Sequence, residues 1–204
     1  MTIGLYGTSD TLPLPERFDY FLFLDYETTG DPDQKLLEVG WMLTTRDLEP
    51  LFECQSIVIR QPVYHMNAKI LKMHTDNKLL QEVANTTTEV WQAEHLVCES
   101  IQSIAEQPNN RIVLAGFTCH FDRELMHRDM AKLDRRLHYR HFDVSVPRGM
   151  YSNWVEQIPS KKDEHPHRAK DDVLASWEIA KTFRTLFQIR MPKLADPELE
   201  GMPI

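Results

Sequence analysis

The stretch from Phe18 to Asp31, FDYFLFLDYETTGD, constrains the fold of this chain more than any other. Its apolar run, Tyr20–Leu24, is typical of a buried strand that carries Asp25 and Glu27 to its end. Residues two apart on a strand point to the same side, so both carboxylates can approach one point. Neighbouring carboxylates resist joint ionisation unless a cation lies between them, and oxygen ligands suit Mg²⁺ or Mn²⁺. The stretch therefore predicts a buried strand that ends in a cation-binding carboxylate pair.

The composition favours one soluble globular domain over residues 1–204, with a core from about 18 to 187. Three widely spaced cysteines form no C-x-x-C pair, which favours free thiols in a reducing, cytoplasmic compartment. No stretch reads as a signal peptide or as a membrane span. The net charge of -8 argues against a protein that coats long nucleic acid, but not against an enzyme that acts on a nucleic-acid end. Basic residues gather between Arg123 and Arg148, as a local patch or as a solvated helix face.

Strand and helix patterns follow one another along the chain. Strands are expected at 18–26, 36–45, 51–60, 111–115 and 141–146, and helices at 86–107, 121–137, 147–157 and 169–187, with two short helices within 68–83. Thr86 and Glu89 are expected to form the capping box of the helix that ends before Pro108. Three strands joined by short links, followed by alternating helices and strands, predict a mixed α/β sheet covered by helices. In such folds, sites collect at strand ends where the topology changes.

Three further residues that could carry chemistry lie at element boundaries. Asp122 begins the helix after the RIVLA strand, Asp172 lies in the first turn of the last helix, and His167 precedes that helix. Each has an ordinary structural explanation, because acids favour the helix dipole in first turns and a histidine beside a proline loop is usually a surface residue. In combination with the D-x-E of the first strand, they are far more specific.

The combined pattern of D-x-E at a strand end, an aspartate at a helix start and H-x4-D before the last helix resembles the DEDDh (DnaQ-like) 3′–5′ exonucleases. The resemblance implies a ribonuclease-H-like fold, with a mixed five-stranded sheet of three antiparallel and two parallel strands flanked by helices. It implies that Asp25, Glu27, Asp122 and Asp172 hold two divalent metal ions, Mg²⁺ or Mn²⁺, and that His167 is the general base. Together these five residues would be the catalytic set.

A narrower resemblance is to oligoribonucleases, which degrade very short RNAs to nucleoside 5′-monophosphates. It is carried by the HYR-x-x-DVS form of Leu137–Ser145, the H-x-A-x-D-D form of His167–Asp172 and an H-T pair at His74. The resemblance implies a short single-stranded RNA substrate and a homodimer in which the tyrosine of HYR reaches the partner's site. The implied substrate-binding residues are Thr28, His74, Thr118, Tyr139, Arg140 and Ser145.

Two positions depart from the oligoribonuclease pattern. Asp31 stands where those enzymes usually have a leucine, and Lys69 where they have a tryptophan. Both of those residues would contact a base, so the resemblance predicts the chemistry more firmly than the substrate. A DnaQ-type exonuclease acting on single-stranded DNA therefore stays an alternative. The other alternative is a non-catalytic nucleic-acid-binding module on the same fold, which the presence of all five catalytic candidates disfavours.

Overall fold

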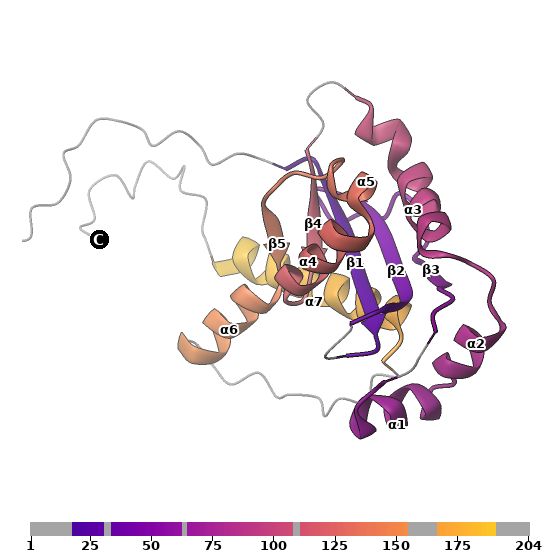
Figure 1. Cartoon of the computed structure of the whole chain (residues 1–204). Coiled ribbons are helices and arrows are strands. Elements are labelled where there is room, and N and C mark those ends of the chain that lie inside the picture. Colours follow the sequence, from indigo (N-terminus) through magenta and orange to yellow (C-terminus); the bar gives the residue numbers. More distant parts are fainter. Residues whose placement is uncertain (1–17, 31–33, 63–64, 108–110, 155–166, 191–204) are drawn as a thin grey trace, which may run out of the picture.

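The computed structural model describes residues 18–30, 34–62, 65–107, 111–154 and 167–190 (Figure 1). Five strands form a single sheet, and helices lie on both of its faces. The strands are β1 (Tyr20–Thr28), β2 (Leu36–Thr45), β3 (Gln55–Val58), β4 (Ile112–Gly116) and β5 (His141–Asp143). The helices are α1 (Ala68–Asp76), α2 (Leu79–Asn85), α3 (Val90–Ala105), α4 (Cys119–Asp129), α5 (Ala131–Asp134), α6 (Ser145–Trp154) and α7 (Ala169–Arg190).

The sheet has the strand order β3-β2-β1-β4-β5. β1 pairs antiparallel with β2, and β2 antiparallel with β3. β4 lies parallel to β1 on the other side, and β5 parallel to β4. The predicted mixed sheet of three antiparallel and two parallel strands is therefore confirmed. The direction of pairing changes at β1, which makes this central strand the place where the topology switches.

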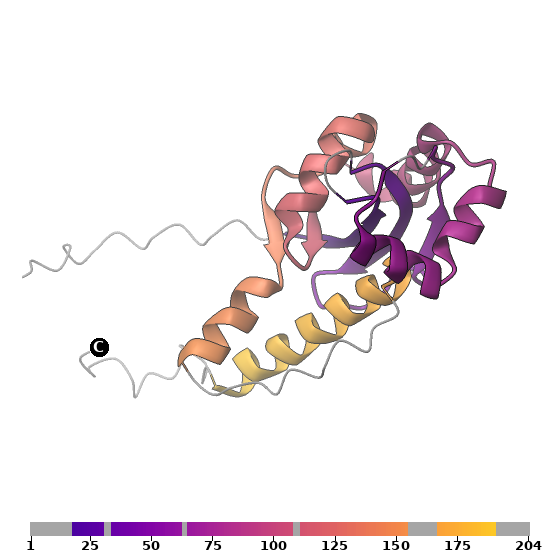
Figure 2. The same ribbon diagram turned by 60° about the horizontal axis from the view of Figure 1, so that its bottom comes forward.

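The two faces of β1 follow the period of two that a strand imposes. The even-numbered residues from Leu22 to Tyr26 belong to the core under α3, α4 and α5. Phe21 and Phe23 belong to the opposite core, under α7. Figure 2 shows α7 running along that second face. Asp25 and Glu27 continue the series of Phe21 and Phe23, so their side chains lie on the face that α7 covers.

Several element boundaries differ from the expectation. β1 extends to Thr28, so Asp25 and Glu27 lie within the strand, just before a register shift between Glu27 and Thr28. The strand expected at 51–60 shortens to β3, and the helix expected at 121–137 is divided into α4 and α5 at Met130, whose φ of -131° is not helical. The strand expected at 141–146 ends at Asp143, and α6 begins at Ser145 instead of at residue 147, while residues 155–157 lie outside the described residues. The first of these differences matters for function, because residues inside a paired strand are held rigidly.

The start of α3 was also predicted wrongly. The capping box is formed by Glu89 and Gln92, one turn later than the expected pair of Thr86 and Glu89. The Thr86 hydroxyl instead donates to the carbonyl of Val58, which ties the segment before α3 to the end of β3. The same hydroxyl accepts from the backbone N–H of Thr88, so Thr86 makes a local turn and a tertiary contact in place of the predicted capping box.

Some large apolar residues are exposed. Phe187 in α7 is 51% exposed and Phe121 in α4 is 56% exposed. No residue of α6 is fully buried, and its Val146, Met150 and Trp154 are exposed. Among the described helices, none is both long and apolar enough to span a membrane.

Candidate active site

Three carboxylates meet between β1 and the first turn of α7. One oxygen each of Asp25, Glu27 and Asp172 lies within 4.8 Å of the others. Asp25 and Glu27 are brought there by the strand period, and Asp172 by the packing of α7 on the same face of the sheet. Glu27 is only 8% exposed, whereas Asp25 and Asp172 are half-buried. The structure therefore brings together three of the acids named from the sequence.

Burial and mutual repulsion make ionisation of this cluster unfavourable. Burial raises the pKa of Asp25 well above its usual value, and the charges of Asp122, Asp172 and Glu27 raise it further. Burial is also the main cause that raises the pKa of Glu27 to about 9, with Asp172 as the next contributor. Carboxylates in this arrangement either hold protons or require a compensating positive charge.

Asp122 lies in the first turn of α4 and contacts the backbone of β1. Its Oδ1 accepts a hydrogen bond from the backbone N–H of Tyr26 at 3.3 Å, and the side chain is 7% exposed. Burial raises the pKa of Asp122, although the hydrogen bond from Tyr26 opposes this effect. Asp122 is thus placed next to the strand that carries the other acids, and its charge contributes to the raised pKa of Asp25.

The donor set fits a hard divalent cation. Every candidate ligand is a carboxylate oxygen, which is the ligand type that Mg²⁺ and Mn²⁺ prefer. The raised pKa values of Asp25 and Glu27 record an excess of buried negative charge that a bound cation would offset. Asp25, Glu27 and Asp172 would hold such an ion, and Asp122 is near enough to influence it.

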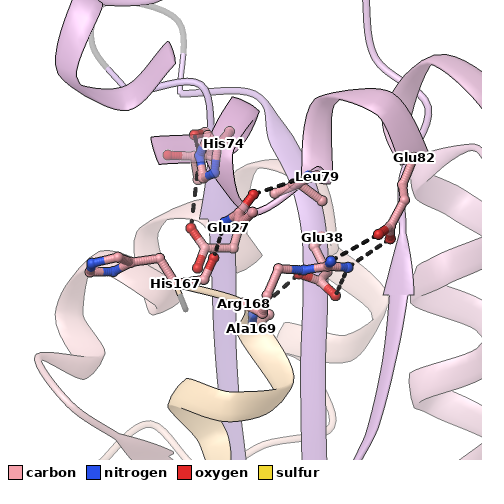
Figure 3. Close-up of polar contacts among 10 residues, drawn as sticks. Glu27, Glu38, His74, Leu79, Glu82, His167, Arg168 and Ala169 are labelled. Carbon is pink, nitrogen blue, oxygen red and sulfur yellow. Dashed lines mark hydrogen bonds and ion pairs between the residues drawn. The ribbon is translucent and has the colours of Figure 1, made fainter. Parts of the chain in front are cut away.

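His167 lies on the short segment that leads into α7, two residues before the helix begins. Its side chain is exposed, and its backbone φ of 48° is in the left-handed region. In Figure 3, the His167 ring extends away from the neighbouring Arg168, whose side chain turns toward Glu38. The histidine is therefore open to a substrate, but its backbone conformation needs support from its surroundings.

His74 and Thr28 form a buried contact behind the acids. His74 is completely buried, and its Nε2–H donates to the carbonyl oxygen of Thr28 at 3.0 Å. The same nitrogen lies 3.8 Å from Oε2 of Glu27 (Figure 3). Burial lowers the pKa of His74, which favours a neutral ring. His74 therefore supports the end of β1 from α1. Because its side chain is fully buried, it is not accessible to a substrate as the sequence had suggested.

Asp143 organises two of the predicted substrate-binding residues. Its carboxylate accepts hydrogen bonds from the backbone N–H of Thr118 and Cys119, both at 3.1 Å. It also accepts from the backbone N–H and the hydroxyl of Ser145, at 2.9 Å and 2.5 Å. Partial burial opposes ionisation of Asp143, but these hydrogen bonds outweigh it and lower its pKa. Asp143 thereby joins the end of β5 to the first turn of α4, which carries Asp122.

Tyr139 and Arg140 lie on the surface before β5. Tyr139 is 69% exposed, and the Arg140 Nε donates to its hydroxyl oxygen at 3.2 Å. Several other members of the basic cluster bind protein groups instead of facing solvent. The Arg123 guanidinium pairs with Asp134, for example. Their contacts favour the structural interpretation for part of the cluster.

The two departures from the oligoribonuclease pattern have different outcomes. Lys69 lies on α1 with its side chain exposed to solvent, at the position where oligoribonucleases have a tryptophan. Asp31 lies outside the described residues.

The strand order, the acids on the switch strand and the aspartate that follows β4 are those of the ribonuclease-H-like exonucleases. A family model described as "Exonuclease" matches residues 22–180, and the chain belongs to this family. It is 32% identical over 172 residues to an oligoribonuclease of Chromobacterium violaceum, covering 81% of this chain and 94% of the relative. It is 29% identical over 179 residues to a probable oligoribonuclease of Dictyostelium discoideum, covering 85% of this chain and 93% of the relative.

Solved structures give the same fold. The exonuclease I of Methylocaldum szegediense aligns with a TM-score of 0.61 at 18% identity, over 86% of this chain and 41% of that one. A zinc-bound E. coli exonuclease I in complex with single-stranded DNA aligns with a TM-score of 0.57 at 20% identity, over 85% of this chain and 42% of that one. This chain thus spans about two fifths of the exonuclease I chains. It is a hydrolytic exonuclease of the oligoribonuclease-like type, and members of this family depend on divalent metal ions.

Sequence reasoning missed several residues that support the site. Glu38 is 1% exposed and interrupts an otherwise apolar strand, a signal that could have identified it. Arg168 binds Glu38 across 130 residues of sequence, and Asn77 binds the backbone of His167. No sequence pattern indicated these last two contacts, because they depend on the tertiary fold.

Proposed function

We propose that this protein is a metal-dependent 3′–5′ exonuclease that hydrolyses short single-stranded RNA to nucleoside 5′-monophosphates. The observation that carries the proposal is the meeting of Asp25, Glu27 and Asp172 at the switch strand, with His167 on the segment next to them. The family relationship to oligoribonucleases supports the substrate class.

In the proposed mechanism, Asp25, Glu27, Asp122 and Asp172 bind two divalent ions, Mg²⁺ or Mn²⁺. When bound, these ions activate a water and neutralise charge on the terminal phosphodiester. His167 takes the proton of the attacking water as general base, a role for which an exposed imidazole is suited.

The substrate end would lie against residues that border the acids. Thr118 and Ser145, both oriented by Asp143, are placed at the start of α4 and the start of α6. The Thr118 hydroxyl and the guanidinium of Arg140 would donate to a terminal phosphate, and the Ser145 hydroxyl would do so after leaving its hydrogen bond to Asp143. We assign Thr28 and His74 a supporting place, because His74 is buried and binds the carbonyl of Thr28.

The proposal is tested with a 5′-labelled dinucleotide, a longer RNA and a single-stranded DNA, each with Mn²⁺, Mg²⁺ or EDTA. We expect stepwise release of mononucleotides from the 3′ end, no product in EDTA and the fastest turnover on the shortest RNA. Asp25→Asn should abolish product release, whereas Glu49→Gln, a change of an exposed acid in a loop, should leave it unchanged. Activity that survives Asp25→Asn would refute the metal assignment.

The panel also separates the alternative substrates. Faster degradation of DNA than of RNA would indicate a DnaQ-type DNA exonuclease, in line with the exonuclease I structure that was solved with single-stranded DNA. Binding of the oligonucleotides without hydrolysis would indicate a binding module.

We also propose that the chain acts as a homodimer in the cytoplasm. The exposed side chains of Val146, Met150 and Trp154 recur at four-residue spacing along α6, and Tyr139 is 69% exposed. Apolar stripes of this kind mark interaction surfaces. Cys54, Cys98 and Cys119 are free and buried, which supports a reducing compartment. A monomer in sedimentation, together with full activity of Tyr139→Phe, would remove the dimer from the proposal.

A further inference from the structure

The segment that carries His167 is held in an unfavourable conformation. The φ of 48° places this residue in the left-handed region, where the Cβ atom of any residue other than glycine lies too close to the following carbonyl oxygen. Such a conformation persists only where surrounding contacts determine it. The described residues around His167 provide these contacts from two separate parts of the chain, the pair α1–α2 and the strand β2.

The first contact is made by Asn77, at the junction between α1 and α2. Its Nδ2 donates to the backbone carbonyl oxygen of His167 at 2.7 Å. Its Oδ1 accepts from the backbone N–H of Leu79 at 3.0 Å, which fixes the amide at the start of α2. The orientation of the Asn77 side chain is thereby set, and the carbonyl of His167 is bound to a rigid helical turn 90 residues away in sequence.

The second contact is made by Arg168, the next residue along. Its guanidinium binds both oxygens of Glu38, through Nε at 2.9 Å and Nη2 at 3.1 Å. It also binds both oxygens of Glu82 in α2, through Nη1 at 2.9 Å and Nη2 at 2.7 Å (Figure 3). Two bidentate pairs on one guanidinium fix its position and its plane.

Glu38 is the buried partner in this arrangement. It is 1% exposed, and its Oε2 also accepts from the backbone N–H of Ala169 at 3.2 Å. It stands directly opposite Glu27 in the pairing of β1 with β2. Arg168 therefore compensates a buried carboxylate beside the acidic cluster, and Glu38 in turn fixes the first residue of α7.

We propose that Asn77 and Arg168 are positioning residues that hold the His167 ring at the scissile phosphate, through the backbone of residues 167–169. The inference rests on the proposed role of His167 as general base. It predicts that loss of either contact slows the chemical step without removing the metal-binding acids, which lie on β1 and in the first turns of α4 and α7. A shift of about 1 Å in a reacting group lowers turnover by about 100-fold.

The test compares Asn77→Ala and Arg168→Lys with the wild-type protein. Lysine keeps the charge of Arg168 but loses the bidentate geometry. We expect kcat on a short RNA to fall by about 10- to 100-fold in each variant, with KM and Mn²⁺ affinity changed by less than about twofold. Hydrogen exchange of the amides of Ala169, Asp171 and Asp172 should become faster, because their partners are Glu38 and the backbone of Arg168.

Two matched controls come from the same helices. Asn85→Ala removes a side-chain amide that donates to the carbonyl of Gln81 in α2, and Arg184→Lys alters an arginine of α7 that pairs with the exposed Asp47. Both should leave kcat and the exchange of residues 169–172 unchanged.

The outcomes separate this inference from the proposed function. Wild-type kcat and unchanged exchange in both test variants would overturn the inference, as would a fall in kcat matched by an equal loss of Mn²⁺ affinity. If the wild-type protein hydrolyses no oligonucleotide, the proposed function fails. Faster exchange in Asn77→Ala and Arg168→Lys, but not in the controls, would then still support the anchoring of this segment.

Discussion

Replacement of Glu27 by glutamine should stabilise the metal-free protein and prevent its function. Glutamine has the shape of a protonated glutamate but carries no charge, so Glu27→Gln removes a buried carboxylate from the cluster with Asp25 and Asp172. The pKa of Glu27 is raised from its usual 4.5 to about 9, chiefly by burial. Between these values the native protein holds a proton that the unfolded chain releases. The free energy of unfolding of the wild-type protein therefore falls as pH rises through this window.

The magnitude follows from the size of the shift. Each pKa unit corresponds to about 1.4 kcal/mol. A pH of about 7.5 lies about three units above the pKa of Glu27 in the unfolded chain and still below its pKa in the native protein. The largest gain from Glu27→Gln at this pH is therefore about 4 kcal/mol, and relaxation around the cluster reduces it toward about 1 kcal/mol. At about pH 4.5 the gain should nearly vanish, because wild-type Glu27 is then protonated in the native state and about half protonated in the unfolded chain.

The assay is urea unfolding of wild type, Glu27→Gln and the exposed control Glu49→Gln, at both pH values, in EDTA and in excess Mn²⁺. Excess Mn²⁺ should stabilise the wild type, by about 2.7 kcal/mol at 100 times its Kd, and should stabilise Glu27→Gln less. The control should differ from wild type by less than about 0.5 kcal/mol throughout. Lower stability of Glu27→Gln in EDTA at about pH 7.5 would refute the reasoning, because it would show that protein contacts already compensate the carboxylate.

Three further changes test the framework around the site. Gly40→Ala should destabilise the protein by about 1–3 kcal/mol and lower activity, because an added Cβ would lie 2.5 Å from the carbonyl carbon of Ala169; Gly149→Ala, where nothing lies within 4 Å, is the control, and thermal unfolding measures both. Lys78→Gly should raise the free energy of unfolding by up to about 1 kcal/mol, because φ is 66° at this position; no gain in urea unfolding would contradict this. Asp143→Asn should destabilise by about 1–3 kcal/mol and reduce kcat, because an amide N–H₂ would replace an acceptor of backbone N–H groups at the start of α4; an unchanged Tm and kcat would show that these hydrogen bonds are dispensable.

Local pattern was sufficient to predict most of the fold. The run Tyr20–Leu24 is apolar because both faces of β1 are covered, and the period of two correctly places Asp25 and Glu27 on the same side. Prediction was poorest where tertiary contacts compete with local ones. The capping box lies at Glu89 and Gln92, and the hydroxyl of Thr86 donates to the end of β3 and accepts from the backbone N–H of Thr88.

For the candidate site, residue type and spacing named the acids but not what holds them. To predict that Asp25, Glu27 and Asp172 lie together, it was enough to recognise the first strand and the start of the last helix. The contacts of Glu38 with Arg168 and of Asn77 with His167 join residues 130 and 90 positions apart. No periodicity within either segment encodes such a pairing. A charged residue inside an apolar strand, as at Glu38, is the one sequence signal that pointed to it.

The two kinds of support suggest that metal binding and proton removal depend on different parts of the framework. Two of the four acids, Asp25 and Glu27, lie on β1 opposite Gly40 and Glu38 of β2, so their positions are set by the sheet. His167 lies on a strained segment whose position depends on Asn77 and Arg168, and through them on α2 and β2. Disturbance of α2 should therefore move the histidine while Asp25 and Glu27 stay in place. Enzymes altered in this way would lose turnover while keeping most of their affinity for Mn²⁺, whereas substitution of Asp25 or Glu27 should reduce both.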